Sequence, residues 1–113
     1  KLGHTDQIVI ADCGLPIPHG VTCIDLAYEL GKPSFKEVLA AVLADVAVES
    51  SVCAQEITCH NADLWQHLEA LSLNTSQISH EAFKQQTAQA KVIIRTGEAT
   101  PYANVILQSG VIF

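Results

Sequence analysis

Basic residues and aromatic rings are both scarce in this sequence of 113 residues. Six Lys and Arg stand against twelve Asp and Glu, so the net charge is −6, and aromatic residues make up only 5% of the chain. Nucleic-acid binding needs clustered basic residues, and stacking on bases needs aromatic side chains. We therefore expect no nucleic acid as a partner. The shortage of basic residues also argues against attachment to an anionic membrane surface.

A long apolar run is missing as well. The longest one, residues 38–48, is interrupted by Asp45 and is shorter than the roughly 20 residues with which a helix crosses a bilayer. No signal-peptide pattern stands at the start of the sequence. We expect a protein of the cytoplasm with no membrane partner.

The cysteines lack the CxxC spacing of zinc and redox motifs. The four are Cys13, Cys23, Cys53 and Cys59. We interpret them as four small, buried apolar residues in a reducing cytoplasm, with a structural zinc site as the alternative. Phosphate-loop, nucleophile-elbow and HExxH motifs are missing too. His60 and His67 lie seven residues apart, too far for one metal on a helix, and we interpret both as surface residues.

Apolar runs of strand length alternate with segments of helical periodicity. Strands are expected at 7–14 (with a turn at its end), 46–54, 56–58, 91–98 and 104–113, and helices at 32–45, 61–72 and 79–90. Residues 22–31 fit a strand or a short helix. Pro33 suits a first helical turn, and Asn61 and Ser79 are the expected N-caps. This alternation predicts one α/β domain over residues 1–113, a three-layer α/β/α fold with a mostly parallel, Rossmann-like sheet.

Asp12 follows directly on the first apolar run, "IVIA". In open α/β sheets, ligands bind at the C-terminal ends of the strands. The prolines of "GLPIP" would hold a carboxylate there in a fixed position. Asp12 is therefore a candidate ligand-binding residue, and a turn-forming Asp is the alternative.

His4 precedes the same predicted strand, and an imidazole there could donate a proton at neutral pH. The alternative is a surface or capping histidine. His4 and Asp12 are eight residues apart, which is up to ~26 Å in an extended chain at about 3.3 Å per residue. If both act on one small ligand and the segment is straight, they come from two different subunits.

Three polar residues further along complete the set of candidates. His80 begins a predicted helix, where backbone N–H groups favour negative partial charge. Tyr102 and Asn104 alternate along a segment expected to be extended, so they can point to the same side. A phenol and an amide offer uncharged donors and acceptors, which suit a neutral polyhydroxylated ligand. The alternatives are a solvent-exposed histidine, a tyrosine packed on the core and an asparagine in a turn.

Taken together, several motifs resemble the D-ribose pyranase family, the sugar mutarotases of ribose operons, which is sister to the L-fucose mutarotases. The motifs are "LGHTD" at 2–6, "DCGLPIP" at 12–18, "GKPSF" at 31–35, "HEAFKQQT" at 80–87 and "TGEATPYANVIL" at 96–107. They keep the family's order along nearly the whole chain. "GLPIP" and "PYAN" are similar to the ribose branch rather than the fucose branch.

The resemblance implies an enzyme that interconverts the pyranose and furanose forms of β-D-ribose in the cytoplasm, without metal or organic cofactor. It implies a homo-oligomer, pentamers paired into decamers, with sites between neighbouring subunits. His4 is then the proton donor, and the sugar contacts are Asp12, His80, Tyr102, Ala103 and Asn104. The alternatives are a mutarotase for another sugar and a non-catalytic sugar-binding accessory of a ribose transport system.

The sequence also departs from the family pattern. A helical segment that usually precedes "GH" is missing, and Cys23 stands where Arg is common. The chain is several residues short between "HLEAL" and "SHEAF", so we expect a trimmed strand there.

Overall fold

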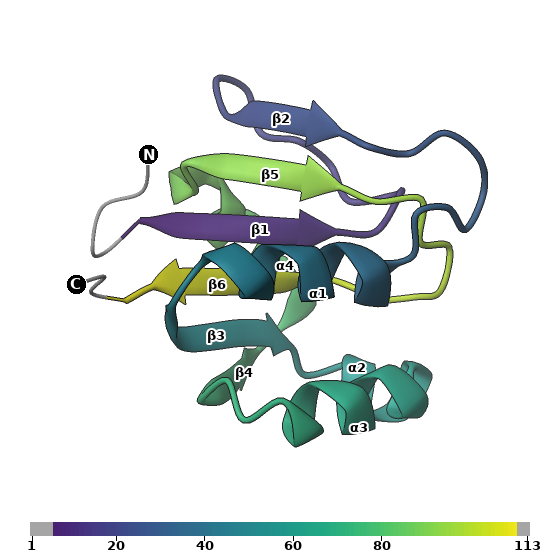
Figure 1. Ribbon diagram of the computed structural model, residues 1–113, viewed down its shortest axis with the longest axis vertical. Helices are drawn as coiled ribbons and strands as arrows, with labels where there is room; N and C mark the ends of the chain where they lie inside the picture. The colour runs from purple at the N-terminus through teal and green to yellow at the C-terminus, as the bar shows by residue number, and fades with distance from the viewer. Residues whose placement is uncertain (1–5, 111–113) are drawn as a thin grey trace.

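A single six-stranded sheet, in the order β2-β5-β1-β6-β3-β4, forms the centre of the protein (Figure 1). The computed structural model describes residues 6–110. The strands are β1 (Gln7–Ala11), β2 (Thr22–Asp25), β3 (Val48–Ala54), β4 (Thr75–Ile78), β5 (Val92–Arg95) and β6 (Val105–Ser109). The helices are α1 (Phe35–Asp45), α2 (Ile57–His60), α3 (Ala62–Ala70), α4 (His80–Gln86) and the 3-10 turn η1 (Thr87–Gln89). Within this part of the chain, no helix is long and apolar enough to span a membrane.

The sheet is mostly parallel. β5 pairs in parallel with β1 and with β2, and β3 pairs in parallel with β4. β6 runs antiparallel to both of its neighbours, β1 and β3. Because β1 and β5 end at the same edge, the segment 96–104 passes the end of β1 before it enters β6 (Figure 1). This crossing brings the residues that precede β6 next to those that follow β1.

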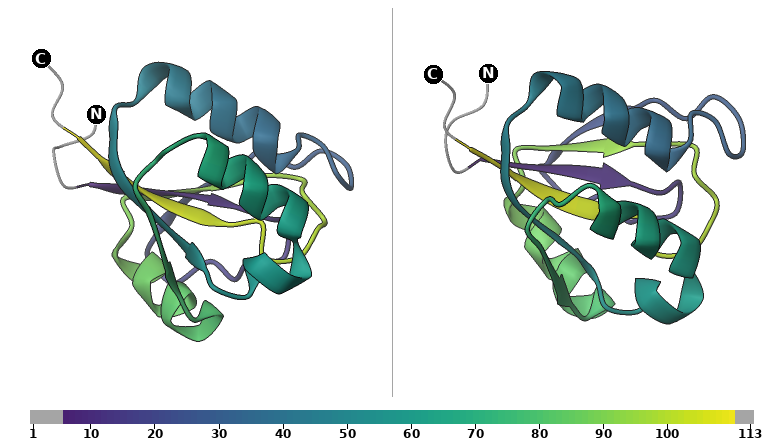
Figure 2. Two further views of the ribbon diagram at one scale, coloured as in Figure 1. Left: turned by 90° about the horizontal axis from the view of Figure 1, so that it is seen from below. Right: turned by 60° about the horizontal axis from the view of Figure 1, so that its bottom comes forward.

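Helices cover both faces of the sheet, and β1 shows why. Its side chains alternate, so that Ile8 and Ile10 pack with α1 and α3, whereas Val9 and Ala11 pack with Phe83 of α4. Figure 2 shows α1 and α4 on opposite sides of the strands. β1 is therefore buried on both faces, as the continuous apolar run "IVIA" predicted. The α/β class and the three layers are confirmed.

α1 begins at Phe35, three residues after the expected start at residue 32 and two after Pro33, which was expected in the first turn. Ser34 is the N-cap, and its hydroxyl accepts from the Glu37 N–H at 3.2 Å while the Glu37 carboxylate accepts from the Ser34 N–H at 3.0 Å. This reciprocal capping box fixes the start of the helix, so Pro33 lies before the cap and outside the first turn. Ser79 caps α4 as predicted, since its Oγ accepts from the Ala82 N–H at 3.1 Å.

The strand expected at residues 56–58 was wrong. The Gln55 N–H makes a last bond to the Ile78 carbonyl at 2.7 Å, and the chain then turns into α2, with the Thr58 hydroxyl donating to the Gln55 carbonyl at 2.9 Å. Asn61 precedes α3 but makes no side-chain cap bond. The segment in which a trimmed strand was expected forms β4, a strand of four residues that pairs with β3. The sequence left a strand or a short helix open for residues 22–31, and residues 22–25 form the edge strand β2.

Candidate functional site

A pocket lies at the edge of the sheet where β1 and β5 end. Its volume is about 280 Å³. Three segments form it: the turn after β1, the first residue of α4, and the segment that leads into β6. The lining residues are Asp12, Gly14, Leu15, Pro16, His80, Pro101 and Tyr102. The edge predicted from strand direction therefore does carry a cavity with polar groups.

Asp12 and Asn104 hold each other beneath this pocket. The Asp12 N–H donates to Asn104 Oδ1 at 2.7 Å, and Asn104 Nδ2 donates to Asp12 Oδ2 at 3.2 Å. The other carboxylate oxygen of Asp12 accepts from the Gly14 N–H at 3.0 Å. Asn104 is 1% exposed and does not line the pocket, so its amide affects the pocket by holding Asp12 in place. Asp12 is thus both a turn-forming residue and a lining residue of the pocket.

Burial raises the pKa of the Asp12 carboxyl above its ordinary value. Hydrogen bonds from Gly14, Asn104 and Leu15, and the nearby charge of His80, lower the pKa in part. Burial has the larger effect, so this carboxyl takes up a proton more readily than an exposed one does. A carboxyl of this kind can exchange protons with a bound hydroxyl.

His80 forms the opposite wall. Its backbone N–H donates to both carboxylate oxygens of Glu56, at 3.0 and 3.2 Å, so the expected free N–H at this helix start is already occupied. Its Nδ1 is buried and, within residues 6–110, lacks a hydrogen-bond partner. Since buried nitrogens are nearly always hydrogen-bonded, a ligand hydroxyl in the pocket would satisfy it.

Tyr102 reaches the pocket by a different route from the one expected. Its φ is +56°, so this residue is in the left-handed region and not in an extended segment. The Asn104 N–H donates to the Tyr102 carbonyl at 2.9 Å and closes this turn. The turn sends the Tyr102 ring into the pocket, where its centroid lies 5.0 Å from that of His80, edge to face. Asn104 instead points under the pocket toward Asp12.

The remaining predicted residues fall elsewhere. Ala103 is 0% exposed and packs in the core cluster with α1 and α3, so its methyl group faces away from the pocket. His4 lies outside the described residues. β1 lies between His4 and Asp12 in the sequence and is a regular strand, as the estimate of the distance between these two residues assumed. The structure therefore brings together Asp12, His80, Tyr102 and Asn104.

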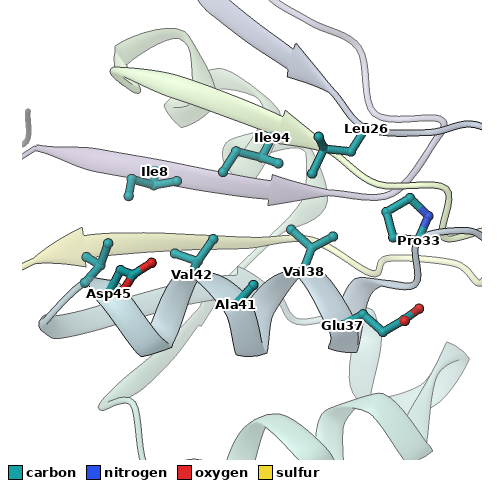
Figure 3. Close-up of a pocket in the computed structure, with 10 residues that line it drawn as sticks. Ile8, Leu26, Pro33, Glu37, Val38, Ala41, Val42, Asp45 and Ile94 are labelled. Atoms are coloured by element: carbon teal, nitrogen blue, oxygen red, sulfur yellow. The ribbon is translucent and has the colours of Figure 1, made fainter.

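Glu56 is a residue of the site that the sequence did not suggest. It precedes α2 in a segment that resembled a strand, and only the fold places its carboxylate on His80. A larger, apolar cavity offers no comparable chemistry. It measures about 470 Å³ and is lined by apolar side chains of α1, β1 and β5, with Glu37 and Asp45 at its ends (Figure 3). Sugar hydroxyls buried there would lose their hydrogen bonds to water without replacement.

No group of three or more His, Cys, Asp or Glu is arranged to hold a metal ion among residues 6–110. The four cysteines, all of them described, are free thiols. The expectation that all four are buried was wrong, because Cys13 and Cys59 are exposed and Cys23 is half-buried. Burial raises the pKa of the Cys53 thiol to about 11, so it stays protonated at neutral pH.

Known proteins of similar sequence are D-ribose pyranases. The one from Bacillus cytotoxicus is 59% identical over 114 residues, which cover 99% of this chain and 87% of the relative. The one from Exiguobacterium sibiricum is 62% identical over 112 residues, with the same coverage of both chains.

Solved structures agree with these sequences. Bacillus subtilis RbsD complexed with D-ribose superimposes with a TM-score of 0.97 at 50% identity, over 99% of this chain and 87% of that one. The fucose mutarotase of Streptococcus pneumoniae in complex with L-fucose shares the fold, with a TM-score of 0.82 at 24% identity over 100% and 88% of the two chains. The model of the RbsD / FucU transport protein family matches residues 1–112. The chain belongs to this family, as its five motifs predicted.

Proposed function

We propose that this protein is a sugar mutarotase that interconverts the pyranose and furanose forms of β-D-ribose by general acid–base ring opening and closure. The observation that carries the proposal is the 59% identity to a D-ribose pyranase over 99% of the chain. The pocket supports it independently, because it joins a carboxyl, an imidazole and a phenol in about 280 Å³.

The chemistry consists of proton transfers. On opening, the anomeric hydroxyl loses its proton, the ring oxygen gains one, and the bond between that oxygen and the anomeric carbon breaks to give the aldehyde. A different hydroxyl then adds to the aldehyde carbon and loses its proton, while the aldehyde oxygen gains one and becomes the new anomeric hydroxyl, which closes the other ring. Placed acid and base groups accelerate such steps by typically ~10²–10⁴-fold.

We assign the roles as follows. His4 protonates the ring oxygen, and Asp12, His80 and Tyr102 hold the hydroxyls, with the backbone at Ala103 behind them. The Nδ1 of His80, which has no hydrogen-bond partner in the described part of the chain, and the raised pKa of Asp12 support these assignments. Asn104 acts by holding Asp12. One of these groups, or water, takes the proton of the anomeric hydroxyl.

We further propose that the active form is a homo-oligomer, pentamers paired into decamers, in which His4 of one subunit completes the pocket of its neighbour. The straight strand β1 supports a shared site, because it separates the residues before it from Asp12. Exposed apolar side chains on β2 and the segment after it also support an oligomer. There Ile24, Leu26, Tyr28 and Leu30 are 47%, 43%, 72% and 79% exposed. Large apolar side chains gathered at a sheet edge are typical of interfaces.

The proposed compartment is the cytoplasm. Four free thiols fit a reducing environment.

The first experiment is NMR saturation transfer between the anomeric protons of D-ribose, with and without the full-length protein. We expect pyranose–furanose exchange to be faster than in buffer, and faster for D-ribose than for L-fucose. Exchange at the buffer rate would refute the mutarotase.

A second candidate is a non-catalytic sugar-binding accessory of a ribose transport system. The description of the family as a transport protein family favours it. The two candidates share the pocket, and the same experiment separates them. An accessory binds D-ribose, seen as line broadening, without accelerating the exchange. A third candidate, a mutarotase for another sugar, would accelerate exchange of that sugar and leave D-ribose at the buffer rate.

A further inference from the structure

Four rings form a row through the pocket, from the protein surface to the core. The centroids of His60 and Tyr102 are 5.6 Å apart, those of Tyr102 and His80 5.0 Å, and those of His80 and Phe83 6.4 Å. Phe83 is fully buried, whereas His60 is exposed at the end of α2. Tyr102 therefore lies between two imidazoles, one that lines the pocket with it and one that lies outside the lining.

The backbone around Tyr102 is fixed, but its ring is not fixed by hydrogen bonds. Asn61 Nδ2 donates to the Pro101 carbonyl at 2.9 Å and to Thr100 Oγ1 at 3.0 Å, which anchors the turn before Tyr102. Within residues 6–110, the phenol oxygen of Tyr102 makes no hydrogen bond that would hold the ring. The direction of the ring then depends on the side chains packed against its faces and edges.

His60 is positioned to supply this packing. It lies directly before Asn61, so neighbouring residues contact the ring of Tyr102 and the carbonyl before it. At the other end of the same short segment, Glu56 holds the backbone of His80. The segment 56–61 therefore contacts both walls of the pocket from outside, through Glu56 on His80 and His60 on Tyr102.

We propose that His60 is a positioning residue, whose imidazole holds the Tyr102 ring in the orientation that receives the sugar. This inference rests on the proposed function of the pocket. An aromatic contact of this kind changes a binding constant by about two- to tenfold. Because Tyr102 is assigned to holding the sugar in both ring forms, losing its support should weaken binding more than the chemical step.

The test compares His60→Ala with His60→Phe, which keeps a ring, and with His67→Ala, a half-buried histidine on α3, as the matched control. We expect His60→Ala to raise the KM for D-ribose about three- to tenfold with kcat changed less than about twofold. His60→Phe should restore a KM within about twofold of the wild type, and His67→Ala should leave KM and kcat unchanged. A wild-type KM in His60→Ala would overturn the proposal, as would a His60→Phe variant as impaired as His60→Ala.

A spectroscopic readout reports the ring itself. The chain has two tyrosines, and Tyr28 is 72% exposed, so in a protein labelled on tyrosine Tyr28 serves as the internal reference. The ring-proton shifts of Tyr102 should move in His60→Ala while those of Tyr28 stay, and unmoved Tyr102 shifts would overturn the proposal. If the wild type does not accelerate exchange, the mutarotase fails, and the Kd for D-ribose replaces KM. Weaker binding in His60→Ala then still supports the positioning role, and equal binding, or no ribose binding by the wild type, overturns it.

Discussion

Asp12 and Asn104, which are 92 residues apart in sequence, exchange two hydrogen bonds beneath the pocket. The backbone N–H of Asp12 and its carboxylate are both engaged by the same amide. One residue therefore fixes the end of β1, the direction of the carboxylate and the start of β6. The consequences of changing Asn104 should be visible in both stability and binding.

Asn104→Ala should destabilise the protein by about 1–3 kcal/mol, because it leaves the Asp12 N–H without its acceptor in a largely buried position. Urea unfolding would measure this change. Gln66→Ala, an exposed position on α3, is the control and should stay within about 0.5 kcal/mol. An Asn104→Ala variant as stable as the control would show that water replaces the amide without cost.

Asp12 should make stability depend on pH. Because burial raises its pKa, the folded state holds this proton to higher pH than the unfolded chain does. Its contribution to the free energy of unfolding is present below the unfolded pKa and is lost as pH rises through the folded pKa. Urea unfolding of the wild type and Asp12→Asn from about pH 3 to about pH 7 measures the difference between them. As pH rises, the wild type should lose stability relative to Asp12→Asn. A wild type that gains stability relative to Asp12→Asn as pH rises would contradict the raised pKa of Asp12.

Glu56→Ala should impair sugar binding although this carboxylate does not line the pocket. The change frees the N–H of His80 and loosens the placement of its ring. We expect the KM for D-ribose to rise about three- to tenfold, from the loss of a hydrogen bond to a charged group. Glu56→Gln keeps an oxygen acceptor and should recover most of the loss. Equal defects in the two variants would indicate that charge, and not the hydrogen bond, matters.

Gly97→Ala should unfold the protein or cost about 3–5 kcal/mol. A Cβ at this position would clash with the backbone of Lys32, and backbone atoms cannot move aside as a flexible side chain can. Gly110→Ala is the control, since its Cβ would meet ordinary contacts at 3.6 Å. Thermal unfolding followed by circular dichroism compares the two, and similar melting temperatures would contradict the close approach of these segments.

His4→Ala should abolish the acceleration of exchange and leave D-ribose binding within about threefold of the wild type, as expected for an acid that acts in the transition state. Saturation transfer and calorimetric titration measure the two quantities. A loss of binding as large as the loss of exchange would identify His4 as a sugar contact instead.

Local patterns in the sequence predicted the elements that depend on local physics. The apolar run of β1, the helical periodicity of α1 and the Ser79 cap are set by near neighbours. Asp12 could be predicted as a candidate because it directly follows a buried strand, and this position can be read from the local sequence.

What could not be predicted depends on contacts far along the chain. α2 forms where the bond from Gln55 to Ile78 ends the pairing of β3, and three residues of "EIT" carry no sign of this. The left-handed Tyr102 depends on the turn into β6, and a bulky residue is not expected there. The roles of Glu56 and Asn104 appear only when distant segments meet. His60 was interpreted as a surface residue, and it is exposed, but its contact with Tyr102 needed the fold.

The place of β1 in the sheet also bears on synthesis of the protein. It is the first strand of the described chain, yet both of its partners, β5 and β6, come from the last quarter of the sequence. During synthesis, the β1 residues Ile8, Val9 and Ile10 cannot pair with β5 and β6 until nearly the whole chain has left the ribosome. An apolar strand exposed for so long is a natural binding site for chaperones and a starting point for aggregation. Shortening the chain before β6 should therefore reduce the yield of folded protein far more than the loss of a single strand would suggest.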